Sequence, residues 1–163
     1  MASQKDTINS IDAWLLTKKS PLAGYADALV WCARKSGVAI TLSLGIAQAE
    51  SQCGVDPLYN QSDLVGHNVW GYGQSPGNGH GWLFPSWPDG ISSVTDWLFK
   101  GYVSQGLTTV ELICPKWVGV YSQSWVDNVS QVMRQFGGDP EKCSRVPLMN
   151  YGDGTPPLIV ENP

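Results

Sequence analysis

The stretch TLSLGIAQAESQCG, residues 41–54, is an apolar run with a single carboxylate, Glu50, near its end. At 3.6 residues per turn its apolar side chains gather on one face, formed by Leu42, Ile46, Ala49 and Cys53. Glu50 lies at the edge of that face, where partial desolvation raises the pKa of a carboxyl group, as a general acid requires. The run predicts a helix that ends at Gly54 and carries a candidate acid. A solvated or ion-paired glutamate on a helix flank is the ordinary alternative.

Two helices are predicted before this run. The first covers residues 8–17, where apolar residues recur at helical spacing. The second is expected to start with Ser20 as N-cap and Pro21 in the first turn, and to end at Gly37.

The chain changes character after the run. Residues 55–90 mix glycine and proline with Trp and Tyr and have no sustained period, which predicts a loop or short-hairpin lobe. Helical spacing returns over 94–102 and, more briefly, over 107–113. A last helix is expected from Ser124, with Asp127 in capping-box spacing, to the glycines at 137 and 138.

The predicted fold is therefore mainly α: a helical bundle around the Glu50 helix with a small loop or hairpin lobe. Residues 1–138 are predicted to form one domain, and residues 139–163, which have no periodicity and contain several prolines, an extended strap or linker. A chain of 163 residues is a usual size for one domain, and we expect a monomer.

Charge and composition exclude several partners. A net charge of −4 without a Lys/Arg cluster argues against nucleic acid, and no apolar run approaches the roughly 20 residues of a membrane span. The first ten residues lack the apolar core of a signal peptide. Eight Trp and six Tyr either fill a core or line a groove for a flat, polar ligand.

Four cysteines without CxxC spacing indicate buried thiols rather than a metal site, and no metal or cofactor is expected. One or two disulfides are the alternative outside a cell. A Cys/His peptidase would use Cys53 or Cys32 as nucleophile and His67 or His80 as base. Cys53 lies at the C-terminal end of its predicted helix, where the helix dipole disfavours a thiolate, so this class is disfavoured.

Four segments together resemble, in order and spacing, the lysozyme-like glucosaminidases that cut bacterial peptidoglycan. They are AQAESQCG (47–54), HNVWGYG (67–73), WLFPSWPDGISSVTDWLF (82–99) and YSQSWVDNVSQVM (121–133). The resemblance implies an α+β lysozyme-like fold in which Glu50 protonates the glycosidic oxygen and Tyr121 faces the cleft. It also implies a set of sugar-binding residues, namely Ser51, Asn68, Trp70, Tyr72, Gln74, His80 and Trp82. For Trp70 and Trp82, packing in the core is an equal alternative.

This chain lacks one feature of the family, a second carboxylate in the expected segment. Glycosidases usually have a second carboxylate about 5 to 9.5 Å from the first, but the segment GYGQSPGNGHGW, residues 71–82, contains no Asp or Glu. Asp89 or Asp63 could swing into the cleft, although Asp89 beside Gly90 is more typical of a turn or helix cap. Schemes with one glutamate are favoured: the N-acetyl group of the substrate acts as nucleophile, or a lytic transglycosylase uses Glu50 as acid and then base.

The sequence thus predicts a cofactor-independent endo-β-N-acetylglucosaminidase that hydrolyses the glycan strand of bacterial peptidoglycan. A lytic transglycosylase or muramidase on the same fold, and a non-catalytic glycan-binding module, are the alternatives. Synthesis in a host cytoplasm without a signal peptide and action on the cell wall are expected of a phage lysin. A domain of a longer secreted chain is the other possibility.

Overall fold

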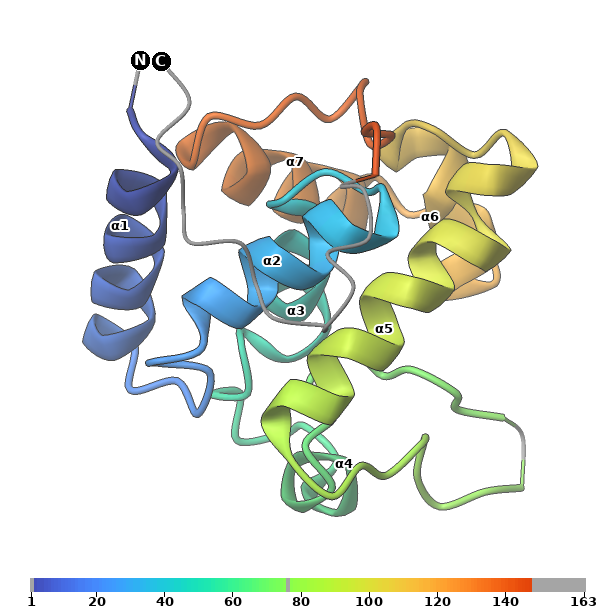
Figure 1. Ribbon diagram of the computed structural model, residues 1–163. Helices are drawn as coiled ribbons and strands as arrows, with labels where there is room; N and C mark the ends of the chain where they lie inside the picture. The colour runs from blue at the N-terminus through green and yellow to red at the C-terminus, as the bar shows by residue number, and fades with distance from the viewer. Residues whose placement is uncertain (1, 76, 148–163) are drawn as a thin grey trace.

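A computed structural model describes residues 2–75 and 77–147, and within these ranges the regular structure is helical, without strands. The helices are α1 (Gln4–Thr17), α2 (Ala26–Ser36), α3 (Leu42–Ser51), α4 (Gln61–Val65), α5 (Trp87–Gly101), α6 (Val110–Val118) and α7 (Gln123–Gln135), with a 3-10 turn at Val103–Gln105. In Figure 1 α3 lies at the centre, behind α2 and between α1 and α5. The prediction of a mainly α fold is confirmed.

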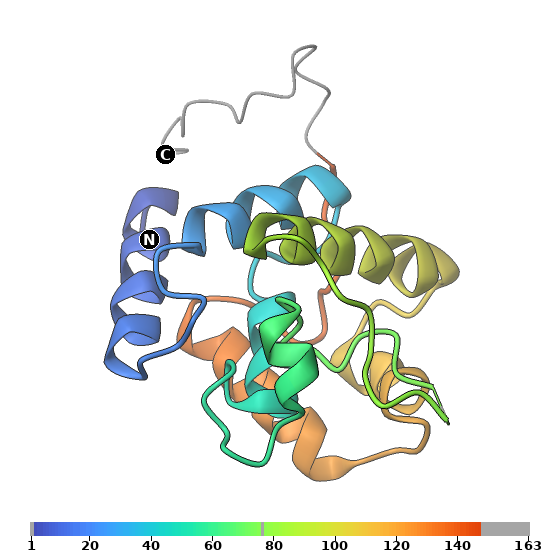
Figure 2. The same ribbon diagram turned by 90° about the horizontal axis from the view of Figure 1, so that it is seen from below.

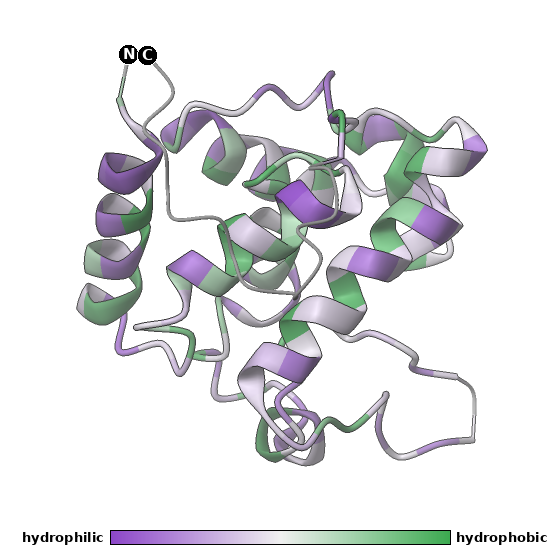
Figure 3. Cartoon of the chain, in the orientation of Figure 1, coloured by the Kyte–Doolittle hydropathy of each residue, from purple (hydrophilic) through white to green (hydrophobic). Residues whose placement is uncertain are grey.

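Helix α1 begins four residues before the predicted start because Ser3 and Asp6 form a capping box. The Ser3 hydroxyl accepts a hydrogen bond from the Asp6 amide at 3.1 Å, and the Asp6 carboxylate accepts one from the Ser3 amide at 3.2 Å. Its apolar side faces the bundle and its charged side faces solvent (Figure 3). The predicted start was based on the spacing of apolar residues, and that spacing gives no information about the polar capping pair.

Helix α2 ends as predicted, with Gly37 in the left-handed conformation at φ 90°, but starts at Ala26 instead of Pro21. The Ser20 hydroxyl donates to the carbonyl of Cys53 at 2.6 Å and accepts from the Leu22 amide at 3.1 Å. Ser20 therefore joins the turn before α2 to the segment after α3, and the residues between Pro21 and Ala26 form turns.

Helix α3 ends at Ser51, three residues before the predicted stop. Gln52 and Cys53 already have positive φ values of 50° and 56°, ahead of Gly54 at 82°. This left-handed stretch turns the chain sharply away from the helix, so Glu50 lies in the last helical turn, next to where the irregular lobe begins.

Helices α3 and α7 pack closely along their length (Figure 2). A Cβ on Gly45 would lie 2.8 Å from the carbonyl oxygen of Val129, so this approach requires glycine. Helix α7 is capped by Ser122, two residues before the predicted Ser124, and it buries Val126, Val129 and Met133 as expected.

The lobe between α3 and α5 is irregular apart from the short helix α4, and it contains no hairpin in its described residues. Residues 139–147 form a strap against the start of α3: the amide of Ala39 donates to the Cys143 carbonyl at 2.8 Å, and that of Arg145 donates to the Gly37 carbonyl at 2.9 Å. The remaining part of the predicted strap, residues 148–163, lies outside the described residues. In the part of the chain that is described, no helix has the length and apolar character needed to span a membrane.

Candidate functional site

Glu50 is half-buried, and its two carboxyl oxygens have different neighbours. The indole N–H of Trp125 donates to Oε1 at 2.9 Å, while Oε2 lies against Gly71, where a Cβ would be 3.1 Å away. Burial raises the pKa of Glu50 above the ordinary 4.5, and the indoles of Trp125 and Trp117 oppose this in part. The net direction favours a protonated carboxyl group.

These neighbours are fixed by the packing of their elements. Trp125 is in the first turn of α7, where its amide donates to the Ser122 hydroxyl at 3.3 Å, and α7 packs on α3. Gly71, at φ 61°, is held by Tyr59: the Gly71 amide donates to the Tyr59 hydroxyl at 2.9 Å, and that hydroxyl donates to the carbonyl of Asn68 at 2.8 Å. The carboxyl group thus sits between α7 and the turn that follows Asn68.

Glu50 opens on a cleft formed by two adjoining pockets of about 460 and 420 Å³. The acid half is lined by Glu50, Gly71, Gln74, Ser75, Asn78, Trp117 and Val118. The aromatic half is lined by Gly71, Tyr72, Gly73, Gln74, Trp82, Trp97, Tyr102, Lys116 and Trp117. Gly71, Gln74 and Trp117 belong to both, so the halves form one continuous groove.

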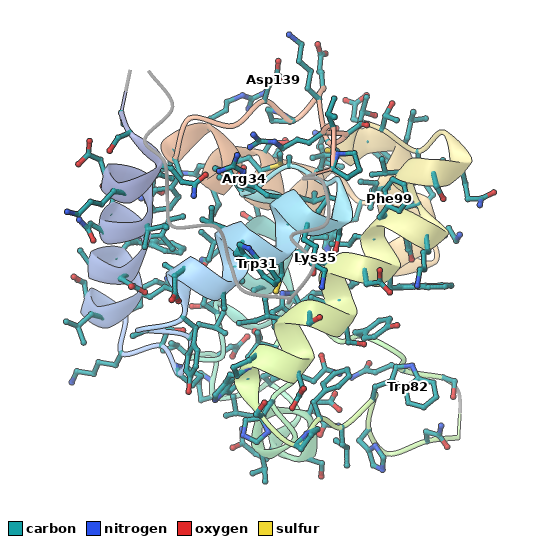
Figure 4. All side chains as sticks on the ribbon, in the orientation of Figure 1. Trp31, Arg34, Lys35, Trp82, Phe99 and Asp139 are labelled. Atoms are coloured by element: carbon teal, nitrogen blue, oxygen red, sulfur yellow. The ribbon has the colours of Figure 1, made fainter. Side chains whose placement is uncertain are left out.

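The aromatic half is built from rings contributed by separate elements. Tyr72 stacks on Trp117 with centroids 6.3 Å apart and planes 19° apart, and Tyr102 lies 5.5 Å from Trp117. Trp97 of α5 lies 6.4 Å from Tyr102, edge to face. Trp82, on the loop after α4 (Figure 4), is 61% exposed and packs on Gly73. Of these rings Trp82 and Trp97 are the exposed ones, at 61% and 40%, and exposed ring faces are suited to stacking on flat, polar ligands such as sugars.

One wall of the cleft is held by Asp63 at the centre of α4. Asp63 is fully buried, and its carboxylate accepts from the Gln74 side-chain amide at 2.7 Å and from the Gly81 amide at 2.6 Å. Asn60, the N-cap of α4, donates to the carbonyl of Gly79 at 2.7 Å. These bonds fix both ends of the loop that contributes Ser75 and Asn78 to the acid half.

Four of the predicted site residues meet in this cleft: Glu50, Tyr72, Gln74 and Trp82. Three others are fully buried and act within the fold, which corrects the expected contact of Ser51 and Asn68 with sugar and selects the core-packing alternative for Trp70. Ser51 donates to the Val69 carbonyl at 2.6 Å, Asn68 donates to the carbonyls of Tyr72 and Trp82 at 2.9 Å each, and Trp70 donates to the Ser43 carbonyl at 2.9 Å.

The last three predicted residues lie outside the cleft lining. His80 is exposed, with Nδ1 2.7 Å from the Gly81 carbonyl, and Tyr121 is exposed and donates to the Gln123 side chain at 2.9 Å. Asp89 accepts from the Ser86 hydroxyl at 2.6 Å at the start of α5 and borders a different pocket, near Cys32 of α2. Asp89 therefore lies in the first turn of α5 and bonds to Ser86, the N-cap of that helix, and neither it nor the buried Asp63 reaches the cleft as a second carboxylate.

All four cysteines are free and buried, as expected. Burial raises the pKa of Cys53 to about 12 and that of Cys32 to about 11, which disfavours a nucleophilic thiolate at either position. No group of three or more His, Cys, Asp or Glu side chains within the described ranges is arranged to hold a metal ion.

The sequence patterns did not indicate that five further residues belong to the site: Trp117, Trp125, Trp97, Tyr102 and Lys116. Three of the five lie inside segments already noted for helical spacing or family resemblance, and the unusual number of Trp residues was the available signal. Which aromatics face the cleft depends on how α5, α6 and α7 dock, and the spacing along one helix does not determine that.

Comparisons of the chain with protein-family models, with curated proteins and with solved structures found no significant match. The chemistry of the cleft is thus the basis for assigning a function. It combines a half-buried acid, held by an indole N–H, with a neighbouring wall of aromatic rings.

Proposed function

We propose that this protein cleaves the glycan strand of bacterial peptidoglycan as an endo-β-N-acetylglucosaminidase, with Glu50 as the general acid. The observation that carries the proposal is the Glu50 carboxyl group, whose pKa is raised by burial at a point where the cleft meets a wall of tryptophan and tyrosine rings. Sugar rings stack on such side chains, and a protonated carboxyl group supplies the proton that the leaving oxygen needs.

The environment of the carboxyl group assigns its two oxygens different tasks. Because Oε1 accepts the indole N–H of Trp125, the proton of the neutral form belongs on Oε2, beside Gly71. Oε2 gives this proton to the glycosidic oxygen as its bond to the anomeric carbon breaks. The Trp125 N–H then stabilises the carboxylate that forms.

Among the described residues that line the cleft, Glu50 is the one carboxylate. This favours a mechanism in which the N-acetyl group of the substrate attacks the anomeric carbon, and Glu50 then takes a proton from the water that completes hydrolysis. The same composition of the cleft supports a second candidate, a lytic transglycosylase. There the Glu50 carboxylate takes the proton of a hydroxyl on the sugar itself, which replaces water.

We propose a lysozyme-like arrangement of the helices, with the Glu50 helix on one side of the cleft and the irregular lobe on the other, where a β lobe would lie in an α+β lysozyme-like fold. We further propose that it acts as a monomer on the bacterial cell wall, as a phage lysin made in the host cytoplasm.

Mass spectrometry of fragments released from purified peptidoglycan tests the proposal. Fragments with N-acetylglucosamine at the reducing end support the glucosaminidase, while reducing N-acetylmuramic acid indicates a muramidase on the same scaffold. Anhydro-muramic ends would indicate the transglycosylase. If the protein binds glycan and releases no fragments, it is a binding module and the proposed activity is wrong.

A further inference from the structure

The cleft contains two charged side chains among its described lining residues, and they lie in different halves. Glu50 is in the acid half and Lys116, from α6, is in the aromatic half. The halves meet at Gly71, Gln74 and Trp117. A ligand that spans the cleft therefore passes an acid at one end and a cation at the other.

Lys116 is exposed, and its ammonium group is placed by its neighbours. Nζ lies 4.6 Å from the centroid of the Tyr102 ring and 5.9 Å from that of Trp97, and it donates to the carbonyl of Gly101, the last residue of α5. These contacts hold the ammonium over the aromatic wall. They use one of its three N–H donors, which leaves two for a ligand.

Lys116 also has no salt-bridge partner in the described part of the chain. Lys100, by contrast, is paired with Asp96 at 2.8 Å on the outer surface of α5. The bond to Gly101 is explained by the position of the Lys116 ammonium group at the C-terminal end of α5, where backbone carbonyls carry partial negative charge. It does not account for a cation inside an aromatic cleft with free donors.

We propose that Lys116 binds a carboxylate of the N-acetylmuramyl unit and so selects which sugar occupies the aromatic half. This inference depends on the proposed action on peptidoglycan. The carboxylate comes either from the lactyl group, where the stem peptide is absent, or from the stem peptide, where the lactyl carboxyl is amidated. A homopolymer of N-acetylglucosamine has neither group.

Selection at Lys116 has a consequence for the reaction. Muramyl units alternate with N-acetylglucosamine along the strand, so every second sugar carries an acidic substituent. A muramyl unit anchored in the aromatic half fixes the register of the strand, and the glycosidic bond next to Glu50 is then always of the same type. Lys116 would be a specificity residue that decides which of the two bonds is cut.

The test measures dissociation constants by calorimetry in the Glu50→Gln background, which prevents turnover. Three oligosaccharides of equal length serve as probes: a muramyl oligosaccharide without peptides, the same one with stem peptides, and a chito-oligosaccharide. Lys116→Gln should lower the preference for muramyl over chito-oligosaccharide about tenfold, the usual effect of losing a hydrogen bond between charged groups. Lys116→Arg should keep most of the preference, and Lys100→Gln is the matched control that should not change it. Melting temperatures verify the fold of each variant.

The outcomes separate the two proposals. A loss confined to the peptide-free probe assigns the lactyl carboxylate, and a loss confined to the peptide-bearing probe assigns the stem peptide. Equal losses on all three probes would make Lys116 a structural residue and overturn the inference. If the wild type binds the muramyl probes through Lys116 and cleaves none, the proposed activity fails while the lysine site stands. If no probe binds, both proposals are wrong.

Discussion

At the scale of single residues, the asymmetry around the Glu50 carboxyl group is the feature that determines its chemistry. Trp125 donates to one oxygen, and Gly71 leaves room beside the other. A general acid must be protonated before the reaction and stable as an anion after it. Burial supplies the first condition, and the indole N–H supplies the second.

Replacing Trp125 with Phe should move the basic limb of the pH–rate profile to higher pH. The indole N–H stabilises the carboxylate and lowers the pKa of Glu50, so its removal raises that pKa further and keeps the acid protonated at higher pH. The measurement is kcat against pH on peptidoglycan for both proteins. A limb that moves to lower pH, or does not move, would contradict this role of Trp125.

How far single residues can be predicted from sequence differs from one to the next. Glu50 could be found because a lone carboxylate in an apolar run is conspicuous without any knowledge of the fold. For Trp70 the sequence left contact with sugar and packing in the core equally open, because an aromatic residue beside Gly71 in a turn has the same pattern whether it faces solvent or, as here, the core. Lys116 could not be found, because its neighbours come from α5.

At the scale of elements, the contact between α3 and α7 places Trp125 against Glu50. Gly45→Ala should destabilise the protein by about 1–3 kcal/mol, the usual cost of overpacking, because the added Cβ would lie 2.8 Å from the Val129 carbonyl. Gly79→Ala is the control, since its Cβ meets nothing within 4 Å. Urea denaturation measures both, and equal stability of the two variants would argue against this close approach.

The loop wall of the cleft depends on Asp63. Asp63→Ala leaves the Gly81 amide and the Gln74 side chain without their acceptor, which should cost about 2 kcal/mol of stability and weaken glycan binding. Denaturation and calorimetry in the Glu50→Gln background measure the two effects. Stability lost without any loss of binding would mean that this loop does not contribute to the cleft.

The existence of the main helices was predictable from apolar spacing, while several of their ends were not. Helix α3 stops at Ser51 because Gln52 and Cys53 adopt left-handed conformations that non-glycine residues seldom take. Ser20 has the identity of an N-cap, but its hydroxyl bonds to the Cys53 carbonyl, 33 positions away in the chain. The local sequence around Ser20 does not show that a distant carbonyl group will take the hydrogen bond of its hydroxyl.

At the scale of the whole molecule, the mainly α class followed from the periodicity of the helices, and the loop lobe from its glycines and prolines. The hairpin offered as an alternative for that lobe is absent from its described residues. The lobe is held by side chains such as Asp63 and Asn60 in place of backbone pairing. Such side-chain hydrogen bonds produce no periodic pattern in the sequence, so they could not be predicted from it.

The core should protect all four thiols as a unit. A small alkylating reagent should leave the native protein unmodified and active, because every cysteine is buried, and should label four thiols in denaturant. Intact-mass measurement counts the labels. Rapid labelling of one native thiol with loss of activity would favour the cysteine-nucleophile alternative over Glu50.

The role of Glu50 as general acid is tested by comparing peptidoglycan cleavage by the wild type, Glu50→Gln and Glu141→Gln. Glu141 is an exposed glutamate beyond α7. Glu50→Gln should keep its melting temperature and glycan binding while turnover falls by orders of magnitude, and Glu141→Gln should cleave like the wild type. Undiminished cleavage by Glu50→Gln would show that Glu50 is not the general acid.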